Sequence, residues 1–320
     1  TSTRSAGSSA LRRTSRSSRE LRRRFTPVAL MAQSGPARLA VEEGLADEAF
    51  ALESAWTASL FGGKPDSRVR DRLSPYSHAL AFSQAPGLAA GLRATAREGV
   101  YTVAPRPSAD LRLHAAEHAW AGAVACGLLP PGAAPPAPSP RAAAPEKDAA
   151  VLIHPGAGSP RKRWPIELFR RVAAAVESEG GRVEYVLGPA DEDLSPHLAD
   201  AVVHRPADTL ALRRLLIAAA ACVGNDSGVS HLAAWLGVPC VTVFGPSDPE
   251  RWRPIGARVA VVRPPVVRVE AQRAVVGVRP GSDRGAVRAC LSSATRPAGG
   301  RRSPPSPSAA GRPRAGGPAG

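Results

Sequence analysis

Residues 149–254 alternate short apolar runs with longer segments whose apolar residues recur every three or four positions. The run "AAVLIH" at 149–154 is typical of a strand buried on both faces. The segment "IELFRRVAAAVESEG" follows with helical spacing and ends at a pair of glycines. The same order recurs in "RVEYVLG" with "DTLALRRLLIAAAA" and in "CVGN" with "VSHLAAWLG", and "CVTVFG" ends the series. This alternation predicts an α/β fold with a parallel sheet that is covered by helices on both faces.

Two polar loops interrupt this pattern, and each follows a predicted strand. They are "HPGAGSPRKRWP" at 154–165 and "GNDSGVSHLAAWLGVP" at 224–239. In parallel sheets, ligands bind outside the carboxyl ends of the strands. We therefore expect the two loops to converge at one edge of the sheet.

The first loop combines glycines, basic residues and a helix start. Gly156 and Gly158 allow a ligand to approach the backbone closely, and the helix start offers free amides and a positive dipole end. Lys162 lies in a basic cluster and is a usual partner of phosphate. No GK[ST] follows the glycines, so this is not a Walker loop. Phosphate binding and an ordinary turn with a solvated basic cluster both remain open here.

The second loop can be explained as a capped helix start or as an anion site. In the first interpretation, Asp226 or Ser227 caps the helix, and His231 lies on its first turn. In the second, the hydroxyl and amides of Ser227, Gly228 and Ser230 receive a diphosphate together with a ring nitrogen of His231. Two anion-friendly helix starts on one sheet edge favour the second interpretation.

The N-terminal half is less regular. "PVALMAQ" and "HALAFS" (78–83) are candidate strands, "PARLAVEEGL" is a candidate helix, and 109–129 is expected to form one long helix. We predict an incomplete N-terminal domain at 19–129, a Pro/Ala-rich linker at 130–148 and a C-terminal domain at 149–295. The Arg/Ser-rich residues 1–18 and the tail 296–320 are expected to lack a packed conformation, because they have little apolar area to bury.

The basic charge does not indicate a nucleic-acid partner. The formal net charge is +15, but the first 24 residues carry +7 and the last 25 carry +5, so the residues between carry about +3. No nucleic-acid-binding motif accompanies this charge. We predict that the protein does not bind nucleic acid.

Cysteine usage and hydropathy point to a reducing, aqueous compartment. The four cysteines show no CxxC spacing, which favours free thiols over a zinc site or disulfides: Cys126, Cys222, Cys240 and Cys290. No metal-ligand cluster is visible, and we predict no metal and no cofactor. The chain has no apolar run of membrane-spanning length, and its first 25 residues lack a signal-peptide core. We expect a cytoplasmic protein.

Residues 149–254 closely resemble the C-terminal domain of the ADP-heptose–lipopolysaccharide heptosyltransferase family. The resemblance lies in "HPGAGSPRKRWP", "LGPADED" and above all "GNDSGVSHLAAWLGVPCVTVFGPSDP". Residues 19–129 resemble the N-terminal domain of that family more loosely. The resemblance implies the GT-B type of fold, with two Rossmann-like domains of which the N-terminal one is incomplete.

The resemblance also implies an activity. Members are inverting glycosyltransferases, so we expect transfer of a sugar, heptose, from a nucleotide-diphospho-sugar such as ADP-heptose. The acceptor would be of the lipopolysaccharide type or another glycan or lipid-linked acceptor, reached by peripheral contact at the inner face of the inner membrane.

Each expected contact maps onto a position of this chain. Lys162 matches a lysine that contacts the donor phosphate, and Asp226 matches the acid that holds hydroxyls of the transferred sugar. Asp191, in "GPADED", falls where an acid contacts the nucleotide ribose. The remaining positions match the diphosphate-binding turn: Ser227, Gly228 and His231.

The opening of the chain departs from the family. Members begin with an apolar strand and a Gly-rich loop that carries an Asp, the general base for the acceptor hydroxyl. Here the region reads "TSTRSAGSSALRRTSRS", without an Asp or an apolar strand. The catalytic base is therefore unassigned. The alternative to an active enzyme is a non-catalytic or truncated protein that binds the nucleotide-sugar.

Overall fold

The computed structural model describes residues 21–22, 24–133, 145–264, 266–267 and 275–276. The terminal segments that were predicted to be unpacked, 1–18 and 296–320, lie outside the described residues, as does Cys290. Most of the predicted linker also lies outside them.

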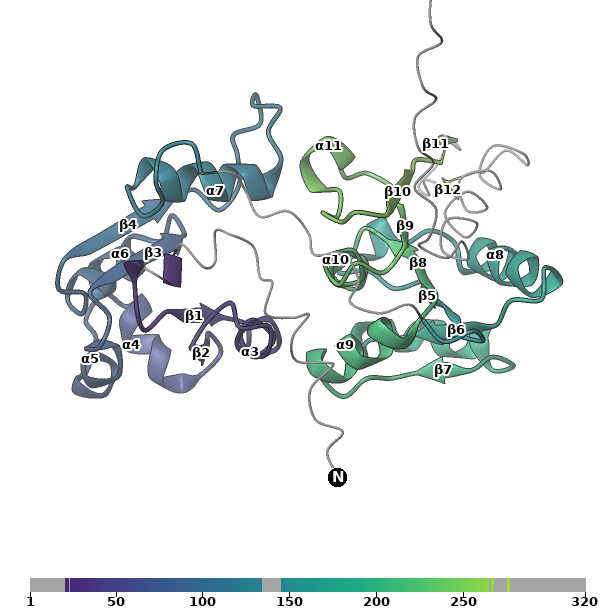
Figure 1. Cartoon of the computed structure of the whole chain (residues 1–320), viewed down its shortest axis with the longest axis horizontal. Coiled ribbons are helices and arrows are strands. Elements are labelled where there is room, and N and C mark those ends of the chain that lie inside the picture. Colours follow the sequence, from purple (N-terminus) through teal and green to yellow (C-terminus); the bar gives the residue numbers. More distant parts are fainter. Residues whose placement is uncertain (1–20, 23, 134–144, 265, 268–274, 277–320) are drawn as a thin grey trace, which may run out of the picture.

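The C-terminal half is built on a six-stranded parallel sheet (Figure 1). Its order is β10-β9-β8-β5-β6-β7. The chain starts at the central strand β5, moves outward to β7 and then returns to β8 on the other side of β5. This reversal creates a switch point between β5 and β8, where ligands of open α/β sheets bind. The strand bounds are β5 Val151–His154, β6 Val183–Val186, β7 Val203–His204, β8 Ala221–Asn225, β9 Cys240–Val243 and β10 Val259–Val262.

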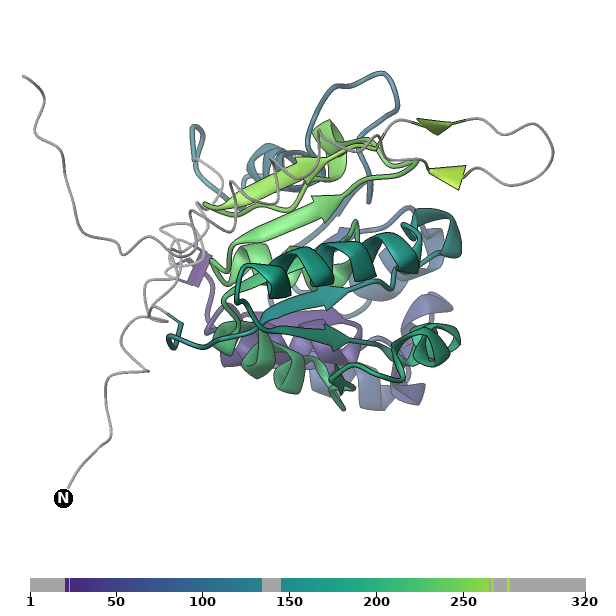
Figure 2. The same ribbon diagram turned by 90° about the vertical axis from the view of Figure 1, so that its right-hand side faces the viewer.

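Helices pack on both faces of this sheet, as the alternation of strands and helices predicts. The helix α8 (Ile166–Ser178) lies across one face of the sheet (Figure 2). Its Phe169 and Val176 pack against that face. The helices α9 (Thr209–Ala218) and α10 (Gly228–Trp235) pack against the other face. Shorter elements complete this half: η2 Pro160–Lys162, η3 Pro189–Leu198, α11 Pro249–Trp252 and a small antiparallel pair, β11 Val266–Val267 with β12 Val275–Val276.

Glycine ends α8 where the sequence predicts that it ends. Gly180 has a φ of 81°, a left-handed conformation that favours glycine. The amide of Gly181 donates back to the Val176 carbonyl at 3.0 Å, which satisfies a carbonyl of the last turn.

The N-terminal half contains two separate parallel strand pairs in its described residues, β1 with β2 and β3 with β4. Both pairs contribute side chains to one apolar cluster around Phe50 and Leu60. The strand bounds are β1 Ala29–Ala32, β2 Glu48–Ala51, β3 His78–Phe82 and β4 Gly99–Val103. The helices are α3 Ser34–Glu42, η1 Ala55–Thr57, α4 Ala58–Phe61, α5 Ser67–Leu73, α6 Pro86–Arg93 and α7 Ala115–Ala125.

The helix that was predicted at 109–129 is shorter than expected. It begins only at Ala115, because His114 caps it by accepting a hydrogen bond from the Ala116 amide at 3.2 Å. The preceding residues form a loop whose carbonyls bond to the C-terminal half. A long-range contact thus overrides the local helical pattern.

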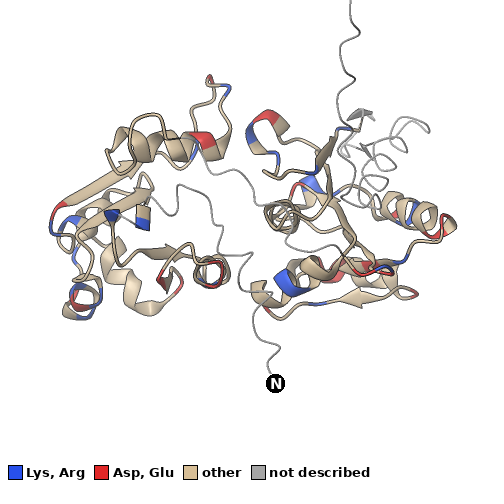
Figure 3. Cartoon of the chain, viewed as in Figure 1, with Lys and Arg blue, Asp and Glu red and all other residues tan. Residues whose placement is uncertain are grey.

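Charged residues of both signs are mixed in the described part of the chain. Figure 3 shows basic and acidic residues interspersed along both halves. Within the described residues, no helix combines the length and the apolar character that crossing a membrane requires.

Candidate functional site

Both polar loops leave the sheet at the switch point between β5 and β8. His154 at the end of β5 is the register partner of Gly224 in β8. The first loop leaves His154 and reaches α8, and the second leaves Asn225 and reaches α10. The expected convergence of the two loops is therefore present, and it follows from the parallel pairing of these strands.

Asn225 joins the two loops from inside the protein. Its fully buried side chain donates to the carbonyls of Pro155 at 2.8 Å and Gly156 at 3.2 Å, and accepts from the Trp164 amide at 2.9 Å. Each of these backbone groups would otherwise need another partner in a buried place. The sequence analysis did not predict this role. The signal for it was the position of Asn225 at the end of an apolar strand, directly before Asp226.

Asp226 is the point at which the two loops meet. Lys162 donates from Nζ to Oδ2 of Asp226 at 2.7 Å, and Nε2 of His231 lies 3.5 Å from Oδ1. The Asp226 side chain is 5% exposed, whereas those of Lys162 and His231 are 38% and 43% exposed. The solvent-accessible ammonium of Lys162 and imidazole of His231 therefore lie on either side of the buried Asp226 carboxylate.

The carboxylate keeps its negative charge. Burial acts to raise the pKa of Asp226, but the polar side chains of His231, Lys162 and Ser247 and the charge of Lys162 outweigh burial. The pKa of Asp226 is therefore held below its ordinary value of 3.8. The ionised carboxylate fixes the positions of Lys162 and His231.

The start of α10 is open. Ser227 has the extended backbone of an N-cap residue, yet its hydroxyl makes no cap hydrogen bond and its buried oxygen has no partner among the described residues. Gly228 is exposed, and a Cβ built on it would meet no atom within 4 Å. The site thus offers an unused hydroxyl and free amides at a positive helix end.

Ser227 is the N-cap residue of α10, one of the two predicted candidates, and its neighbours Asp226 and Ser230 have other partners. Asp226 does not cap α10, because its carboxylate is taken by Lys162 and His231. The hydroxyl of Ser230 does not face a ligand, because it is buried and donates to the Asn225 carbonyl at 2.7 Å.

Asp191, which is predicted to contact the nucleotide ribose, is buried against the first loop. Its side chain is 5% exposed, and it accepts from the Gly188 amide at 3.0 Å and from Arg163 at 3.0 Å. A Cβ on Gly156 would lie 2.2 Å from its carboxyl group. Asp191 therefore braces the first loop, and the solvent-facing acids of the turn are Glu192 and Asp193.

His154 is a second polar residue that sequence reasoning did not single out. It is buried at the end of β5, and its Nδ1 lies 2.9 Å from the Val186 carbonyl, to which it donates. Burial lowers the pKa of His154, so the ring is neutral near pH 7. The side chain therefore serves to hold strand β5 next to β6.

Metal binding has no candidate in this part of the protein. No group of three or more His, Cys, Asp or Glu side chains in the described residues is placed to hold a metal ion.

Sequence comparisons match the C-terminal half. Residues 131–273 match the family described as glycosyltransferase family 9 (heptosyltransferase). Lipopolysaccharide heptosyltransferase 3 of Escherichia coli (strain K12) is 32% identical over 117 residues, which are 34% of this chain and 34% of that protein. Lipopolysaccharide heptosyltransferase 1 of Pseudomonas aeruginosa is 34% identical over 93 residues, 28% of this chain and 26% of that protein. The matched region thus spans about a third of the length of these curated relatives or less.

Solved structures match over most of the chain. A glycosyl transferase family 9 protein from Veillonella parvula has a TM-score of 0.65 at 16% identity, covering 86% of this chain and 92% of that one. ADP-heptose lps heptosyltransferase II of E. coli has a TM-score of 0.63 at 19% identity, covering 90% and 96%. E. coli heptosyltransferase WaaC with ADP has a TM-score of 0.58 at 18% identity, covering 77% and 87%.

These structures confirm the predicted fold class, an α/β fold of the GT-B type. The sequence match adds a similarity to a family. Residues 131–273 of this chain are similar to glycosyltransferase family 9, the heptosyltransferases.

Proposed function

We propose that the protein is a glycosyltransferase that moves heptose from ADP-heptose to a lipopolysaccharide-type acceptor. The observation that carries this proposal is the meeting of Lys162 and His231 on the Asp226 carboxylate, beside the open start of α10. The relatives support it, because they are lipopolysaccharide heptosyltransferases, and two similar WaaC structures hold ADP or ADP-2-deoxy-2-fluoro heptose.

The donor diphosphate would lie against the start of α10. The backbone amides and the unpartnered hydroxyl of Ser227 would donate to it, and Gly228 leaves room for its approach. A ligand can reach the side chains of Lys162 and His231, because both are accessible from solvent. There they would add positive charge beside the diphosphate. Asp226 would orient these two groups and accept from hydroxyls of the sugar.

For the ribose we propose the turn that contains Asp191. Asp191 itself holds the turn in place. The exposed acids beside it, Glu192 and Asp193, pair with Arg205 and Arg163, and their solvent-facing sides would accept from ribose hydroxyls. This division of roles follows from burial alone.

In the inverting reaction, an acceptor oxygen forms a bond to the anomeric carbon while the bond from that carbon to the diphosphate oxygen breaks. The electron pair leaves with the nucleoside diphosphate, where negative charge builds up. Lys162, His231 and the helix amides would stabilise this charge more strongly in the transition state than in the ground state, as catalysis requires.

A base must take the acceptor proton, a role that typically contributes about 10²–10⁴-fold. We assign it to no residue of this chain. The second candidate function is a protein that binds the nucleotide-sugar without transferring it, because the donor-side groups of Lys162, His231 and Ser227 are present while no base is assigned.

A transfer assay separates the two candidates. The full-length chain is incubated with ADP-heptose and an acceptor that lacks heptose, with Asp226→Asn as the impaired reference. ADP release is followed, and the anomeric configuration of the product is determined by NMR. Transfer with inversion supports the enzyme, ADP binding without transfer supports the second candidate, and the absence of both contradicts both.

A further inference from the structure

Among the described residues, the halves of the protein meet at α3 and α9 and again at α11, and the first of these contacts is tightly packed. Glu43, directly after α3, forms an ion pair with Arg213 of α9, and both residues are buried. Gly35 of α3 lies so close to Thr209 that a Cβ would sit 2.2 Å from its hydroxyl oxygen. A buried ion pair and a close helix approach resist separation, because breaking the pair leaves an uncompensated buried charge.

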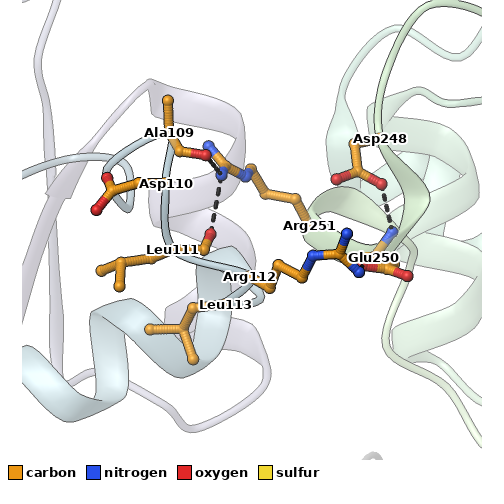
Figure 4. A pocket seen from close by; sticks show the side chains of 8 residues that line it. All are labelled: Ala109, Asp110, Leu111, Arg112, Leu113, Asp248, Glu250 and Arg251. Carbon is orange, nitrogen blue, oxygen red and sulfur yellow. Dashed lines mark hydrogen bonds and ion pairs between the residues drawn. The ribbon is translucent and has the colours of Figure 1, made fainter.

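The second contact is made of exchangeable hydrogen bonds. Arg251 of α11 donates to a ring of backbone carbonyls in the loop before α7, as Figure 4 shows in part. The acceptors and their distances are Pro107 at 3.4 Å, Ser108 at 3.2 Å, Ala109 at 3.1 Å and Leu111 at 3.0 Å. The guanidinium has donors for this geometry, and water could replace each carbonyl if the halves moved apart.

Two further bonds cross the same place. Nε2 of His114 lies 2.9 Å from the Arg253 carbonyl, and because Nδ1 accepts from Ala116, the Nε2 atom is the donor. Arg112 lies 3.8 Å from Glu250. A polar hollow of about 360 Å³ opens among these residues (Figure 4). This contact is therefore polar and exposed, whereas the ion pair between α3 and α9 is buried.

The second contact is also connected to the candidate site. The helix α11 begins at Pro249, two residues after Ser247. The Ser247 hydroxyl is buried without a hydrogen-bond partner among the described residues, and it is one of the groups that lower the pKa of Asp226. A shift of α11 would therefore reach the surroundings of Asp226 within a few residues of chain.

We propose that Arg251 is a positioning residue, which latches the 107–111 loop onto α11 and so holds the N-terminal half over the Asp226 site. The contact between α3 and α9 serves as the pivot. When the hydrogen bonds of Arg251 break, the two halves separate at α11, while the ion pair between Glu43 and Arg213 remains. The effect on activity rests on the proposed function, but the latch itself does not.

Small-angle scattering of the full chain tests the latch without donor or turnover. We expect Arg251→Ala to increase the radius of gyration and the maximum dimension. Arg251→Lys should stay close to wild type, because an ammonium can donate three hydrogen bonds to the same carbonyls. The matched control is Arg253→Ala, which removes an exposed arginine of the same turn and leaves the backbone carbonyl that His114 contacts.

Kinetics adds a second readout if the wild type transfers sugar. Arg251→Ala should lower kcat/KM for the acceptor about tenfold or more, because a misplaced reactant costs rate steeply, while ADP affinity changes by less than about threefold. Melting curves establish that each variant folds. Should the alanine variant melt early, Arg251→Met keeps the side-chain stem, removes the donors and carries the same test. Scattering of Arg251→Ala or Arg251→Met that is identical to that of Arg253→Ala would overturn the latch.

Discussion

At the scale of single residues, the site is organised by a buried carboxylate. Asp226 is charged because Lys162 and His231 compensate its burial, and it in turn keeps those side chains at the start of α10. A phosphate that approaches would meet Lys162 and His231 already oriented, so little side-chain entropy would remain to be lost on binding.

The variant Asp226→Asn tests how much the charged Asp226 carboxylate contributes to stability, and how that contribution depends on pH. Because the pKa of the folded-state carboxylate lies below 3.8, its contribution to stability is complete above that pH and disappears as the pH falls through the folded-state pKa. We expect the variant to lose about 1–3 kcal/mol of unfolding free energy at pH 7, the range for hydrogen bonds to charged groups. Denaturant unfolding at pH 7 and at successively lower pH checks this. A difference from wild type that does not shrink on acidification would argue against it.

Gly156 and Gly158 form a natural pair for testing the first loop. A Cβ at 156 would lie 2.2 Å from the Asp191 carboxyl group, which Gly188 and Arg163 hold in place, whereas a Cβ at 158 meets nothing within 4 Å. Gly156→Ala should cost about 1–3 kcal/mol, as overpacking does. Gly158→Ala should stay within about 0.5 kcal/mol. Equal melting temperatures for the two variants would contradict the brace that we assign to Asp191.

At the scale of elements, the switch point between β5 and β8 brings the loops together and Asn225 fixes them there. Parallel pairing alone would leave the first loop free to move, since it contains two glycines and no regular hydrogen bonds to β8. The three hydrogen bonds of the Asn225 side chain hold the first loop in place, which the sheet alone does not do.

Asn225→Asp is the sharpest test of this link, because it keeps the shape and removes the donor. The carboxylate would face the carbonyls of Pro155 and Gly156, so we expect a loss of about 2–4 kcal/mol, beyond that of a neutral hydrogen bond. ADP affinity should fall with it. Ser230→Ala, which removes a single neighbouring buried hydroxyl, should cost only about 1 kcal/mol. Similar losses in both variants, measured by chemical denaturation, would refute the role of Asn225.

The sequence predicts most elements of the C-terminal half, because their apolar periodicity is a local property. It also predicts that the two loops converge, because the carboxyl ends of parallel strands share an edge. It does not predict that Asp226 pairs with Lys162, or that Asp191 is buried against Gly156. These outcomes depend on contacts between residues far apart in the chain. The late start of α7, at Ala115 and not at 109, has the same cause. Arg251 accounts for it by donating hydrogen bonds to the carbonyls of Ala109 and Leu111 in the loop before this helix.

At the scale of the whole molecule, the similarity in fold to known proteins extends over more of the chain than the similarity in sequence. The sequence match is confined to residues 131–273, whereas solved structures align over most of the chain. The N-terminal half therefore shares the fold with little sequence identity. In our account, this half contributes the acceptor side and is held in place by the α3–α9 contact and the Arg251 latch.

The central claim is that the edge formed by Asp226, Lys162 and α10 binds a nucleoside diphosphate. Calorimetric titration of ADP into the full-length chain tests it most directly, with Lys162→Ala and the neighbouring exposed Arg161→Ala as a matched pair. We expect the wild type to bind ADP and Lys162→Ala to lose about 1.5–3 kcal/mol of binding free energy, the worth of a hydrogen bond to a charged group. Arg161→Ala should change the affinity by less than about threefold, as expected for a solvated surface charge. No binding by a folded wild type, or equal losses in the two variants, would contradict the claim.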